Sequence, residues 1–550
     1  MLLLECSNIK KYFGDRLIID IESLKLYSED RVGIVGVNGA GKTTLVNILT
    51  RRLEPDEGWV ELYGSYSYVS QLQPPRNKRI SAEWASKLRV SSTWHESMSG
   101  GEKTRFKLAQ CFDSNSLMIF ADEPTSNIDM EGIELIENRL VEYQGGLVIV
   151  SHDRSLLDRL CNKIIEVENG KIKLYGGNYS YYSAQKDQER ERAQFEYSQY
   201  VIEKKRLEKV IVDLKQKMKS IKKAPKRMGN SEARLHKMGG QKAKASLARA
   251  IKNTRARIEH LEVKEKPLQQ ELIKLDVVDP KKIYSKVIIE GRNINKNFGD
   301  KVIFRDAEFN IDNGAKVALI GPNGCGKSTL LKMIVNKDDG IKIAPGAKIG
   351  YFSQDMSILD ESLTILENVM ADSIYQETFA RIFLSRLLFK REEVFKKVSA
   401  LSGGERVKVS FAKILLKDFN LLILDEPTNY LDIHSLDVIE EALQNYNGTL
   451  LFASHDRKLI SSVADHIMTI ENHKIKMFNG NFADYLAKKS QAPDNSLEDI
   501  KKQIFVLQNR LSEIIGKLSM PSKNNNLQAL DEEYHKVLNE LKRLKGKVRS

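Results

Sequence analysis

Short apolar runs alternate with amphipathic stretches in two separate parts of the chain. Residues 1–184 contain runs such as 31–35, 117–120 and 147–150 with helical patterns between them, and residues 285–489 repeat this arrangement. Alternation of buried strands and helices is typical of a doubly wound α/β core, which binds its ligands at the carboxyl ends of the strands. The pattern therefore predicts two tandem α/β domains.

A different periodicity fills residues 185–284, between these two parts. Apolar residues step by four and three over 207–221 and again over 247–275, and a proline with several glycines interrupts the pattern between these stretches. We predict an antiparallel α-helical hairpin with an irregular tip near 224–244. Its first helix, of about 38 residues, would be on the order of 55 Å long.

The last part of the chain, residues 490–550, shows a shorter alternation of the same kind. Apolar steps over 497–518 and 527–544 flank a turn-forming stretch at 521–526. A C-terminal helical hairpin is expected there.

Composition narrows the class of protein. An apolar share of 41% and a charged share of 29% are typical of a soluble globular protein, and no stretch approaches the ~18–20 apolar residues of a membrane helix. The N-terminus lacks the basic segment and cleavage site of an export signal. The four cysteines, at positions 6, 111, 161 and 325, form no paired ligand spacing. We expect a reduced, cytoplasmic protein without structural zinc and without stable membrane association.

The net charge of +13 is concentrated in one segment. Residues 215–257 hold fifteen Lys or Arg and the single acid Glu232, so the remainder of the chain is close to neutral. A solvated helix face usually mixes charges of both signs, because pairs at i,i+4 stabilise it. The bias therefore favours a partner rich in phosphate, such as RNA.

Six short motifs recur in the same order in both α/β regions. The first set is Gly36–Thr43, Gln71, Ser99–Glu102, Asp122–Thr125, Asp129 and Ser151–Asp153, and the second is Gly321–Ser328, Gln354, Ser402–Glu405, Asp425–Thr428, Asp432 and Ser454–Asp456. Their offset is 285 residues at the first motif and 303 from the third onward. The difference arises between the glutamine and the Ser-Gly-Gly, 28 residues apart in the first set and 48 in the second. We expect a trimmed helical subdomain in the first region.

The motifs predict two ATP sites. Glycine-rich loops offer backbone N–H groups to phosphate oxygens at a helix N-terminus, and a lysine neutralises the β/γ-phosphates. The residues expected to bind ATP are Phe13, Gly36, Asn38, Gly39, Gly41, Lys42, Thr43, Thr44, Gln71, Ser99, Gly101 and Asp122 in the first set, and Phe298, Gly321, Asn323, Gly324, Gly326, Lys327, Ser328, Thr329, Gln354, Ser402, Gly404 and Asp425 in the second. For Phe13 and Phe298, stacking on adenine competes with a core packing role, and Tyr12 is an alternative stacker in the first region.

The same motifs predict hydrolysis. Glu123 and Glu426 follow apolar strands and are placed to polarise an attacking water, while His152 and His455 contact the γ-phosphate. Mg²⁺ is expected on Thr43, Gln71, Ser328 and Gln354, with Asp122 and Asp425 supporting it. The expected reaction is ATP hydrolysis.

Residues 1–184 and 285–489 resemble the ATP-binding-cassette superfamily through all six motifs. The resemblance implies head-to-tail packing, in which Ser402 completes the site built on Lys42 and Ser99 completes the site built on Lys327. ATP would then join the halves and hydrolysis would release them, within one monomer that acts as an internal pseudo-dimer. Met98 before the first Ser-Gly-Gly and the variant Ser126–Asp129 raise the question of whether the two sites differ.

Two fused cassettes with a charged helical linker resemble the ABC-F family of translation-associated ATPases. The stretches 177–182 and 227–237 add to this likeness. It implies that the ATP-closed protein binds the exit site of the 70S ribosome, with its linker along P-site tRNA toward 23S rRNA at the peptidyl-transferase centre. The long tip and the trimmed first subdomain are most similar to the antibiotic-resistance members, which displace lincosamides, streptogramin A or pleuromutilins.

The expected RNA- and tRNA-contacting residues lie around the linker tip. They are Lys222, Lys223, Lys226, Arg227, Met228, Arg234, His236, Lys237, Lys242 and Lys244. Met228, His236, Leu235 and Met238 are candidates for the closest approach to the drug.

Three alternatives remain. A translation factor that frees stalled ribosomes without conferring resistance would share these features. The ATPase subunit of a drug exporter would need a dock for membrane helices beside Gln71, where the segment is trimmed, and would not need a basic linker. A DNA-directed ATPase predicts duplex-DNA binding and a zinc or coiled-coil clamp, but the zinc ligands are missing, so no DNA partner is expected.

Overall fold

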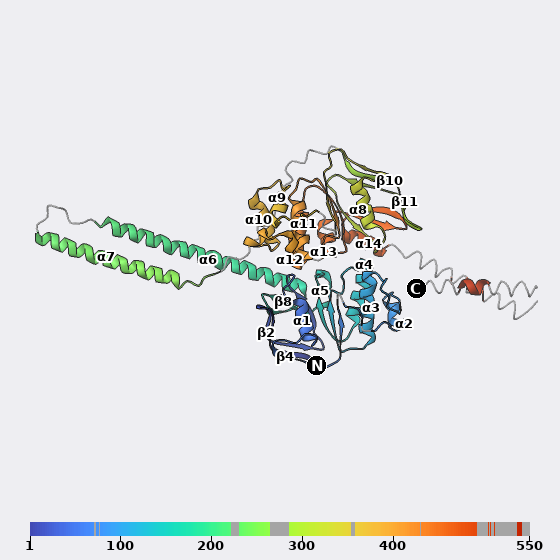
Figure 1. Cartoon of the computed structure of the whole chain (residues 1–550), viewed down its shortest axis with the longest axis horizontal. Coiled ribbons are helices and arrows are strands. Elements are labelled where there is room, and N and C mark those ends of the chain that lie inside the picture. The colour runs from blue at the N-terminus through green and yellow to red at the C-terminus, as the bar shows by residue number, and fades with distance from the viewer. Residues whose placement is uncertain are drawn as a thin grey trace, which may run out of the picture.

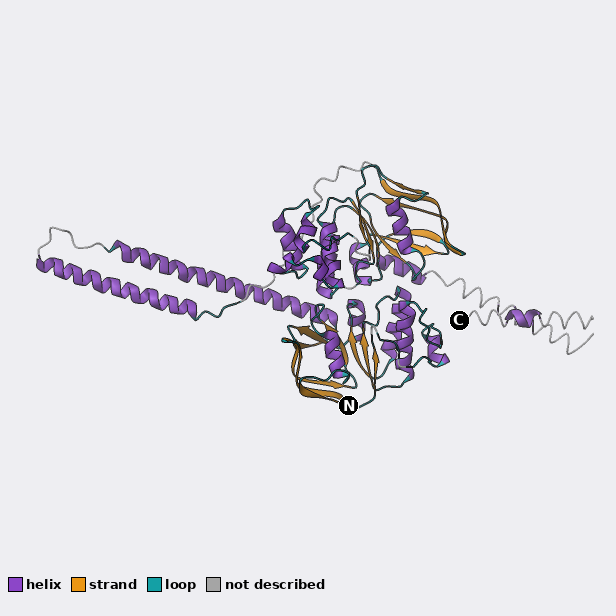
Figure 2. Ribbon diagram, viewed as in Figure 1, coloured by secondary structure: helices purple, strands orange, loops and turns teal. Residues whose placement is uncertain are grey.

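Two α/β lobes and a long helical hairpin make up the described part of the chain (Figure 1). The computed structural model describes residues 1–70, 73–75, 77–221, 230–264, 285–353, 358–429 and 431–491, with residues 504, 507, 511 and 536–541; side chains of 230–241 and 490–491 are outside this description. Strands gather at the outer parts of the lobes and helices face the space between them (Figure 2).

The first lobe has one sheet of nine strands in the order β4-β1-β2-β9-β8-β3-β7-β6-β5. Its core strands run parallel: β5 (Tyr66–Val69), β6 (Met118–Asp122), β7 (Gly146–Val150), β3 (Arg31–Val35) and β8 (Lys163–Glu168). The other strands are β1 (Leu2–Phe13), β2 (Arg16–Tyr27), β4 (Glu57–Leu62) and β9 (Lys171–Gly176). The helices are α1 (Lys42–Leu49), α2 (Ala82–Lys87), α3 (Gly100–Asp113), α4 (Met130–Glu142) and α5 (Arg154–Leu160).

The second lobe repeats this topology in two sheets. Strands β14 (Ile349–Phe352), β15 (Leu421–Asp425), β16 (Thr449–Ala453), β12 (Lys316–Ile320), β17 (His466–Glu471) and β18 (Lys474–Asn479) form one sheet, and β11 (Lys301–Asp312), β10 (Val287–Phe298) and β13 (Ile341–Ile343) form the other. In the first lobe, the pairing of Asp20 on β2 with Lys171 on β9 joins the corresponding parts into one sheet. The prediction of two tandem α/β domains is confirmed.

Helices cover the second lobe more fully than the first. They are α8 (Lys327–Asn336), α9 (Ile365–Met370), α10 (Glu377–Arg386), α11 (Gly403–Leu415), α12 (Ile433–Gln444), α13 (Arg457–Val463) and α14 (Phe482–Gln491), with short 3₁₀ turns at Arg391–Phe395 and Val398–Ala400. Helices α9 and α10 and the 3₁₀ turns occupy the segment where the first lobe has only α2 among its described residues. This agrees with the expected trimming of the first helical subdomain.

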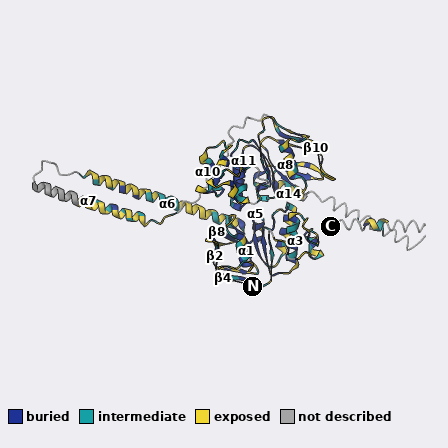
Figure 3. Cartoon of the chain, in the orientation of Figure 1, coloured by how far each residue is buried: buried dark blue, intermediate teal, exposed yellow. Residues whose placement is uncertain are grey.

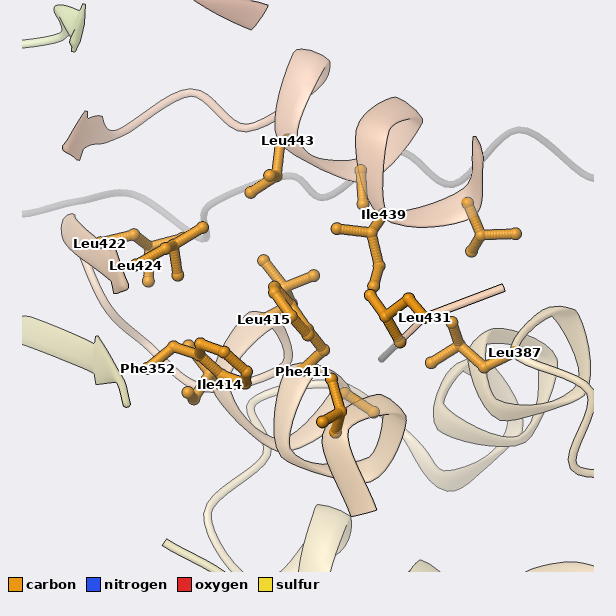
Figure 4. Packing of buried hydrophobic residues seen from close by; sticks show 14 of the residues in the cluster. Phe352, Leu387, Phe411, Ile414, Leu415, Leu422, Leu424, Leu431, Ile439 and Leu443 are labelled. Carbon is orange, nitrogen blue, oxygen red and sulfur yellow. The ribbon is translucent and has the colours of Figure 1, made fainter. Parts of the chain in front are cut away.

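The apolar core of the second lobe lies between the parallel sheet and these helices. Phe411 of α11 stacks near Phe352 of β14, with ring centroids 4.3 Å apart, and Leu422 and Leu424 of β15 lie against the same group (Figure 4). The alternating strand and helix pattern therefore produces a closed core. That core fixes the carboxyl ends of β12, β15 and β16, which is where the motifs lie.

The hairpin consists of α6 (Tyr179–Ser220) and α7 (Asn230–Glu259), which run side by side away from the lobes. Its 42-residue first helix spans roughly 63 Å at 1.5 Å per residue. Leu207, Ile211 and Ile251 are buried in its seam, while most other described side chains are exposed (Figure 3).

Two details of the hairpin differ from the sequence prediction. Helix α6 begins at Tyr179, ahead of the predicted linker start at residue 185, because the Asn178 side chain accepts a hydrogen bond from Tyr181 N and caps the helix there. The prediction of an irregular tip was wrong over residues 230–244, since α7 runs unbroken through Gly239 and Gly240. Each glycine costs a helix about 1 kcal/mol relative to alanine, which neighbouring helix formers offset.

The root of α6 is fixed to the first lobe by a buried carboxylate. Glu166 of β8 accepts hydrogen bonds from the hydroxyls of Tyr182 (2.9 Å) and Tyr175 (3.1 Å) and from Lys186 Nζ (2.8 Å). Helix α14 occupies the matching place in the second lobe, where Thr469 stands at the position of Glu166. The linker is therefore anchored by a polar cluster that the second lobe lacks at this position.

The remaining predicted segments lie largely outside the described residues. These are the linker return over 265–284 and most of the C-terminal hairpin at 490–550, of which residues 536–541 are helical. No described helix is long and apolar enough to cross a membrane. The described residues also contain no cluster of three or more potential metal-ligating side chains.

Candidate nucleotide sites

Each phosphate-loop motif follows a central parallel strand and opens a helix. Strand β3 leads to Gly36–Gly41 and helix α1, and β12 leads to Gly321–Gly326 and helix α8. Gly41 and Gly326 adopt φ of 101° and 113°, a backbone region that glycine enters without a steric cost. The loops therefore turn sharply into the helices that follow them.

A buried lysine lies inside each loop. Lys42 Nζ donates to the carbonyl oxygens of Gly36 (2.8 Å) and Val37 (3.2 Å). Lys327 Nζ donates to those of Gly321 (3.0 Å) and Pro322 (3.3 Å). Each ammonium is thus held where an anion in the loop would meet it. Burial lowers the pKa of Lys42, an effect that nearby carboxylates oppose.

The next residue of each helix contacts a strand-end carboxylate. Thr43 Oγ1 donates to Asp122 Oδ2 (2.9 Å), and Ser328 Oγ donates to Asp425 Oδ1 (3.0 Å). A hydroxyl held by a carboxylate near a phosphate cradle suits Mg²⁺, which prefers few protein oxygen ligands together with substrate phosphates. The donor set therefore fits the ion. Gln71 and Gln354, the other expected ligands, lie outside the described residues.

The expected catalytic pair is present in both lobes. Glu123 Oε1 lies 3.5 Å from His152 Nε2, and Glu426 Oε1 lies 3.3 Å from His455 Nε2. The two glutamates have φ of 51° and 48°, an uncommon value for a residue with a side chain. Such strain is held at a site only where surrounding contacts fix it, and here each N–H donates to the end of the neighbouring strand, at Val150 O or Ala453 O (2.9 Å in both).

Each glutamate–histidine pair contains two buried polar atoms that make no hydrogen bond to another described residue. Oε1 of both glutamates and Nδ1 of both histidines are buried without a hydrogen-bond partner among the described residues. Buried polar groups are rarely left in this state unless a ligand or water completes them. His455 Nε2 also lies 3.2 Å from Lys327 Nζ and from Asn323 Oδ1. The arrangement fits a phosphate and an attacking water between the loop and the glutamate.

Burial shifts the protonation of these groups. It raises the pKa of Glu123 to about 8 and that of Glu426 to about 7, while the adjacent lysines oppose the shift. Burial also lowers the pKa of His152 to about 3 and of His455 to about 4, with Lys42 and Lys327 lowering them further. At neutral pH the histidines are therefore neutral and the glutamates are poised near their ionisation, as suits a group that polarises water.

We expect the two sites to differ in their pH dependence. An ionised glutamate is required, so activity rises as pH passes upward through its pKa. In Glu426→Gln, which leaves Glu123 active, kcat/KM for ATP should rise about tenfold between pH 7 and 9, whereas in Glu123→Gln it should rise about twofold. Steady-state hydrolysis across this range measures both. Equal, flat profiles would contradict the assignment.

The aromatic candidates lie at the tips of the β1–β2 and β10–β11 hairpins. Phe13 is 54% exposed and Phe298 is 58% exposed, and each is followed by a glycine in a tight turn. Tyr12 is also exposed. Such exposure argues against the core-packing alternative for both phenylalanines.

Ser99 and Ser402 cap the helices that follow them. Each side chain accepts from the N–H of the glutamate three residues on, Glu102 or Glu405, and each glutamate returns the interaction. The capping boxes fix the N-termini of α3 and α11, leaving both serines exposed. Of the other expected contacts, Gly101 and Gly404 lie in these first turns, and Thr44 and Thr329 lie in the first turns of α1 and α8.

Each phosphate loop faces the opposite lobe. Asn323 N donates to Asp129 Oδ2 (3.1 Å) and Asn323 Nδ2 to Asn127 O (2.9 Å), while Asn38 N donates to Asp432 Oδ2 (3.4 Å). The Cβ of Asn127 also lies beside Gly100, the residue after Ser99. The Ser-Gly-Gly helix of one lobe thus stands near the phosphate loop of the other.

A cavity of about 770 Å³ opens beside the second phosphate loop. Its lining includes Gly321, Gly324 and Val302 of the second lobe, Tyr485 of α14 and Met130 of the first lobe. The interface between the lobes therefore leaves space next to the loop.

Some of the linker residues expected to contact RNA and tRNA lie within the described part of the chain. Lys222, Lys223, Lys226, Arg227 and Met228 lie outside the described residues. Arg234, His236 and Lys237, with Leu235 and Met238, lie on α7, where only the backbone is described. Lys242 and Lys244 are exposed in the N-terminal half of the same helix.

Sequence reasoning did not select the residues that join the lobes beyond the phosphate loops. Arg154 hydrogen-bonds to Asp437 and Glu440, and Arg457 to Glu137. A signal was available, because Arg154 and Arg457 end the repeated Ser-His-Asp-Arg and Glu137 and Glu440 share its 303-residue offset. Only the packing of the lobes shows that these charges meet.

Two lobes that each place a phosphate loop, a strand-end carboxylate pair and a histidine in this geometry define an ABC-type ATPase. A family model described as "ABC transporter" matches residues 19–83 and 304–429, and a second with the same description matches residues 165–238. The protein hydrolyses ATP.

Similarity to known proteins identifies the family to which this ATPase belongs. The chain is 32% identical over 475 residues to the erythromycin resistance ATP-binding protein MsrA of Staphylococcus epidermidis, covering 84% of this chain and 96% of that protein. It is 29% identical to the ribosome protection protein VmlR of Bacillus subtilis, covering 98% and 97%. ABC transporter F family member 5 of Arabidopsis thaliana is also 29% identical, covering 89% and 78%. The chain belongs to the ABC-F family of ATP-binding proteins.

A solved structure shares the fold. The RNase-L inhibitor superimposes with a TM-score of 0.58 at 19% identity, covering 88% of this chain and 93% of that one. This likeness extends to the tandem arrangement of the two lobes.

Proposed function

We propose that the protein is a ribosome-binding ATPase whose ATP-closed state places the linker inside the ribosome. One observation carries this most directly: a hairpin roughly 63 Å long, with fifteen basic residues over 215–257, projects from the lobes that bind ATP. Basic surfaces bind RNA largely through its phosphate backbone and shape. The name of VmlR, a ribosome protection protein, supports the same partner.

ATP binds between the lobes in this proposal. Lys42 and Lys327 neutralise the β/γ-phosphates, Phe13 and Phe298 stack on adenine, and Ser402 and Ser99 reach the γ-phosphate from the opposite lobe. Mg²⁺, held by Thr43 or Ser328 with the glutamine of the same lobe, would screen phosphate charge. Glu123 and Glu426 accept a hydrogen bond from the attacking water, and the neutral His152 and His455 position the γ-phosphate. Loss of that phosphate removes the contacts that the γ-phosphate makes with both lobes, which weakens the closed state.

The finer proposal concerns where the linker goes. In the exit site of the 70S ribosome it would pass P-site tRNA and 23S rRNA, and its tip would displace antibiotics from the peptidyl-transferase centre. In this proposal the first lobe spans residues 1–184 and the linker spans 185–284. The second lobe spans 285–489, and the C-terminal extension spans 490–550. Likeness to the erythromycin resistance protein MsrA and to VmlR supports resistance over a translation factor without this role.

Growth of a susceptible bacterium tests the resistance proposal. Expression of the protein should raise the inhibitory concentration of at least one lincosamide, streptogramin A, pleuromutilin or macrolide by about fourfold or more. Glu123→Gln with Glu426→Gln should abolish the effect. If growth is unchanged on every class while the protein still binds ribosomes, a translation factor without a resistance role is favoured. Reduced drug accumulation in expressing cells would favour the exporter alternative.

A further inference from the structure

Two reciprocal ion pairs join the lobes near their pseudo-twofold axis. Arg154, the first residue of α5, donates to Glu440 of α12 (2.7 Å) and to Asp437. Arg457, the first residue of α13, donates to Glu137 of α4 (3.1 and 3.0 Å). The two sets are related by the 303-residue repeat, so the same surface is used twice, as in an isologous interface.

Helices α4 and α12 connect these pairs to the phosphate loops. Asp432 caps α12 and accepts from Asn38 N of the first phosphate loop, and Glu440 follows two turns later on the same helix. Asp129 caps α4, accepts from Asn323 N of the second loop, and is followed by Glu137. Each helix therefore touches the opposite lobe at a phosphate loop and, about 12 Å further along, at an arginine.

Both arginines are tied directly to the γ-phosphate histidines. Arg154 is separated from His152 by Asp153 alone, and the side chain of Asp153 caps α5 by accepting from Leu156 N (3.0 Å). Arg457 has the same relation to His455 through Asp456, which caps α13. A shift of either histidine on loss of phosphate would move the first turn of the helix that carries the arginine.

The two ion pairs are unequal. Arg154 is 3% exposed. Among the described residues, it is the ion-pair partner of Glu440. Glu137 is 0% exposed but is held by Arg159 of its own lobe (2.8 Å) as well as by Arg457, which is 24% exposed. Removal of Arg457 thus leaves Glu137 paired with Arg159, whereas removal of Arg154 leaves Glu440 without an ion-pair partner among the described residues.

The linker root lies against the Arg154 side. Tyr179, the first residue of α6, is buried in the apolar cluster that also contains Leu157 of α5 and Ile433 of α12. The pKa of His434, on the first turn of α12, is lowered by burial and then by Arg190 of α6. Burial by itself would lower the pKa of Arg154, but Asp456, Asp437 and Glu440 outweigh it and raise it, so the group stays charged.

We infer that Arg154 and Arg457 are positioning residues that latch the closed lobes through Glu440 and Glu137, and that the Arg154 latch dominates and couples closure to the linker. The inference rests on the proposed ATP-driven closure. In it, ATP holds His152 and the first turn of α5 in place, so that Arg154 meets α12. Hydrolysis at the first site releases that turn, so the contact of Arg154 with α12 is lost beside the linker root.

Lobe closure, followed by fluorescence energy transfer between one label on each lobe, tests the latch. All variants carry Glu123→Gln and Glu426→Gln so that ATP is retained. Arg154→Gln should raise the ATP concentration for half-maximal closure about 30-fold or more, since loss of one partner of a buried ion pair is strongly destabilising. Arg457→Gln should raise it only about threefold. Arg139 pairs with Glu142 within one lobe, so Arg139→Gln is the matched control and should leave this concentration unchanged.

A double-mutant cycle separates latching from general damage. Glu440→Gln with Arg154→Gln should weaken closure far less than the product of the two single effects, because both substitutions remove one interaction. Thermal unfolding without ATP checks that each variant folds. Closure within twofold of the parent for Arg154→Gln, or fully multiplicative effects in the cycle, would overturn the latch while leaving the proposed function intact. A parent that does not close with ATP would overturn both.

Discussion

Replacing Glu123 and Glu426 together by glutamine is expected to reduce ATP hydrolysis by about 10²- to 10⁴-fold and to retain the protein on ribosomes in the presence of ATP. The amide keeps the shape of the side chain but cannot accept a proton from water. ATP then persists between the lobes, and the closed form that carries the linker persists with it. Phosphate release measures the first effect, and co-sedimentation with ribosomes at moderate salt measures the second.

The control for this variant is Glu142→Gln, on the exposed end of α4, which should hydrolyse ATP and sediment like the parent. Single substitutions should each leave part of the activity, because the two lobes contain separate glutamate–histidine pairs. A double variant that loses hydrolysis yet sediments free of ribosomes with ATP would contradict ATP-dependent binding. Retained hydrolysis would contradict the assignment of the glutamates.

Neutralising exposed basic side chains of α7 is expected to weaken ribosome binding by about 10²-fold or more near physiological salt. The variant changes six exposed side chains to glutamine: Lys242, Lys244, Arg249, Lys252, Arg255 and Arg257. Each charge that meets a phosphate releases a counterion, so its loss lowers both the affinity and the dependence of affinity on salt. Ribosome binding measured at several salt concentrations, in the hydrolysis-deficient background, gives both quantities.

The matched control removes the same charge from the lobes. It carries glutamine at six exposed lysines there: Lys78, Lys171, Lys332, Lys337, Lys342 and Lys474. Both variants have the same net charge, so a general electrostatic effect would weaken them equally. The α7 variant should lose affinity and salt dependence, and the same six substitutions in the hydrolysis-competent protein should leave basal ATP hydrolysis at the parent level. Equal losses in the two variants would show that the linker has no special role in binding RNA.

Local sequence accounts for most of the secondary elements and for the content of each half-site. Gly41 and Gly326 permit the turn into the following helix, and apolar runs ending at Asp122 and Asp425 place those carboxylates at strand ends. These features depend on residues close together in the chain, so a repeated pattern is sufficient to predict them. The start of α6 and the unbroken course of α7 were missed. A single cap and the cooperative stability of a long helix determined them.

Some properties of the sites depend on distant contacts. The left-handed backbone at Glu123 and Glu426 is fixed by hydrogen bonds to neighbouring strands, and no local motif requires it. The raised pKa values of these glutamates arise from burial among several elements. Neither property can be read from a pattern of residue types, because each reflects how much water the assembled lobe excludes.

The amino-acid sequence by itself determined the duplicated phosphate chemistry, the basic helical hairpin and the shorter helical segment of the first lobe. Only the tertiary structure decided that Asn38 meets Asp432, that Asn323 meets Asp129, and that Arg154 lies buried against Glu440 in the opposite lobe. The physical reason is that these contacts join groups nearly two hundred to four hundred residues apart. Their energies depend on the shape and desolvation of an interface that exists only after both lobes have folded and met.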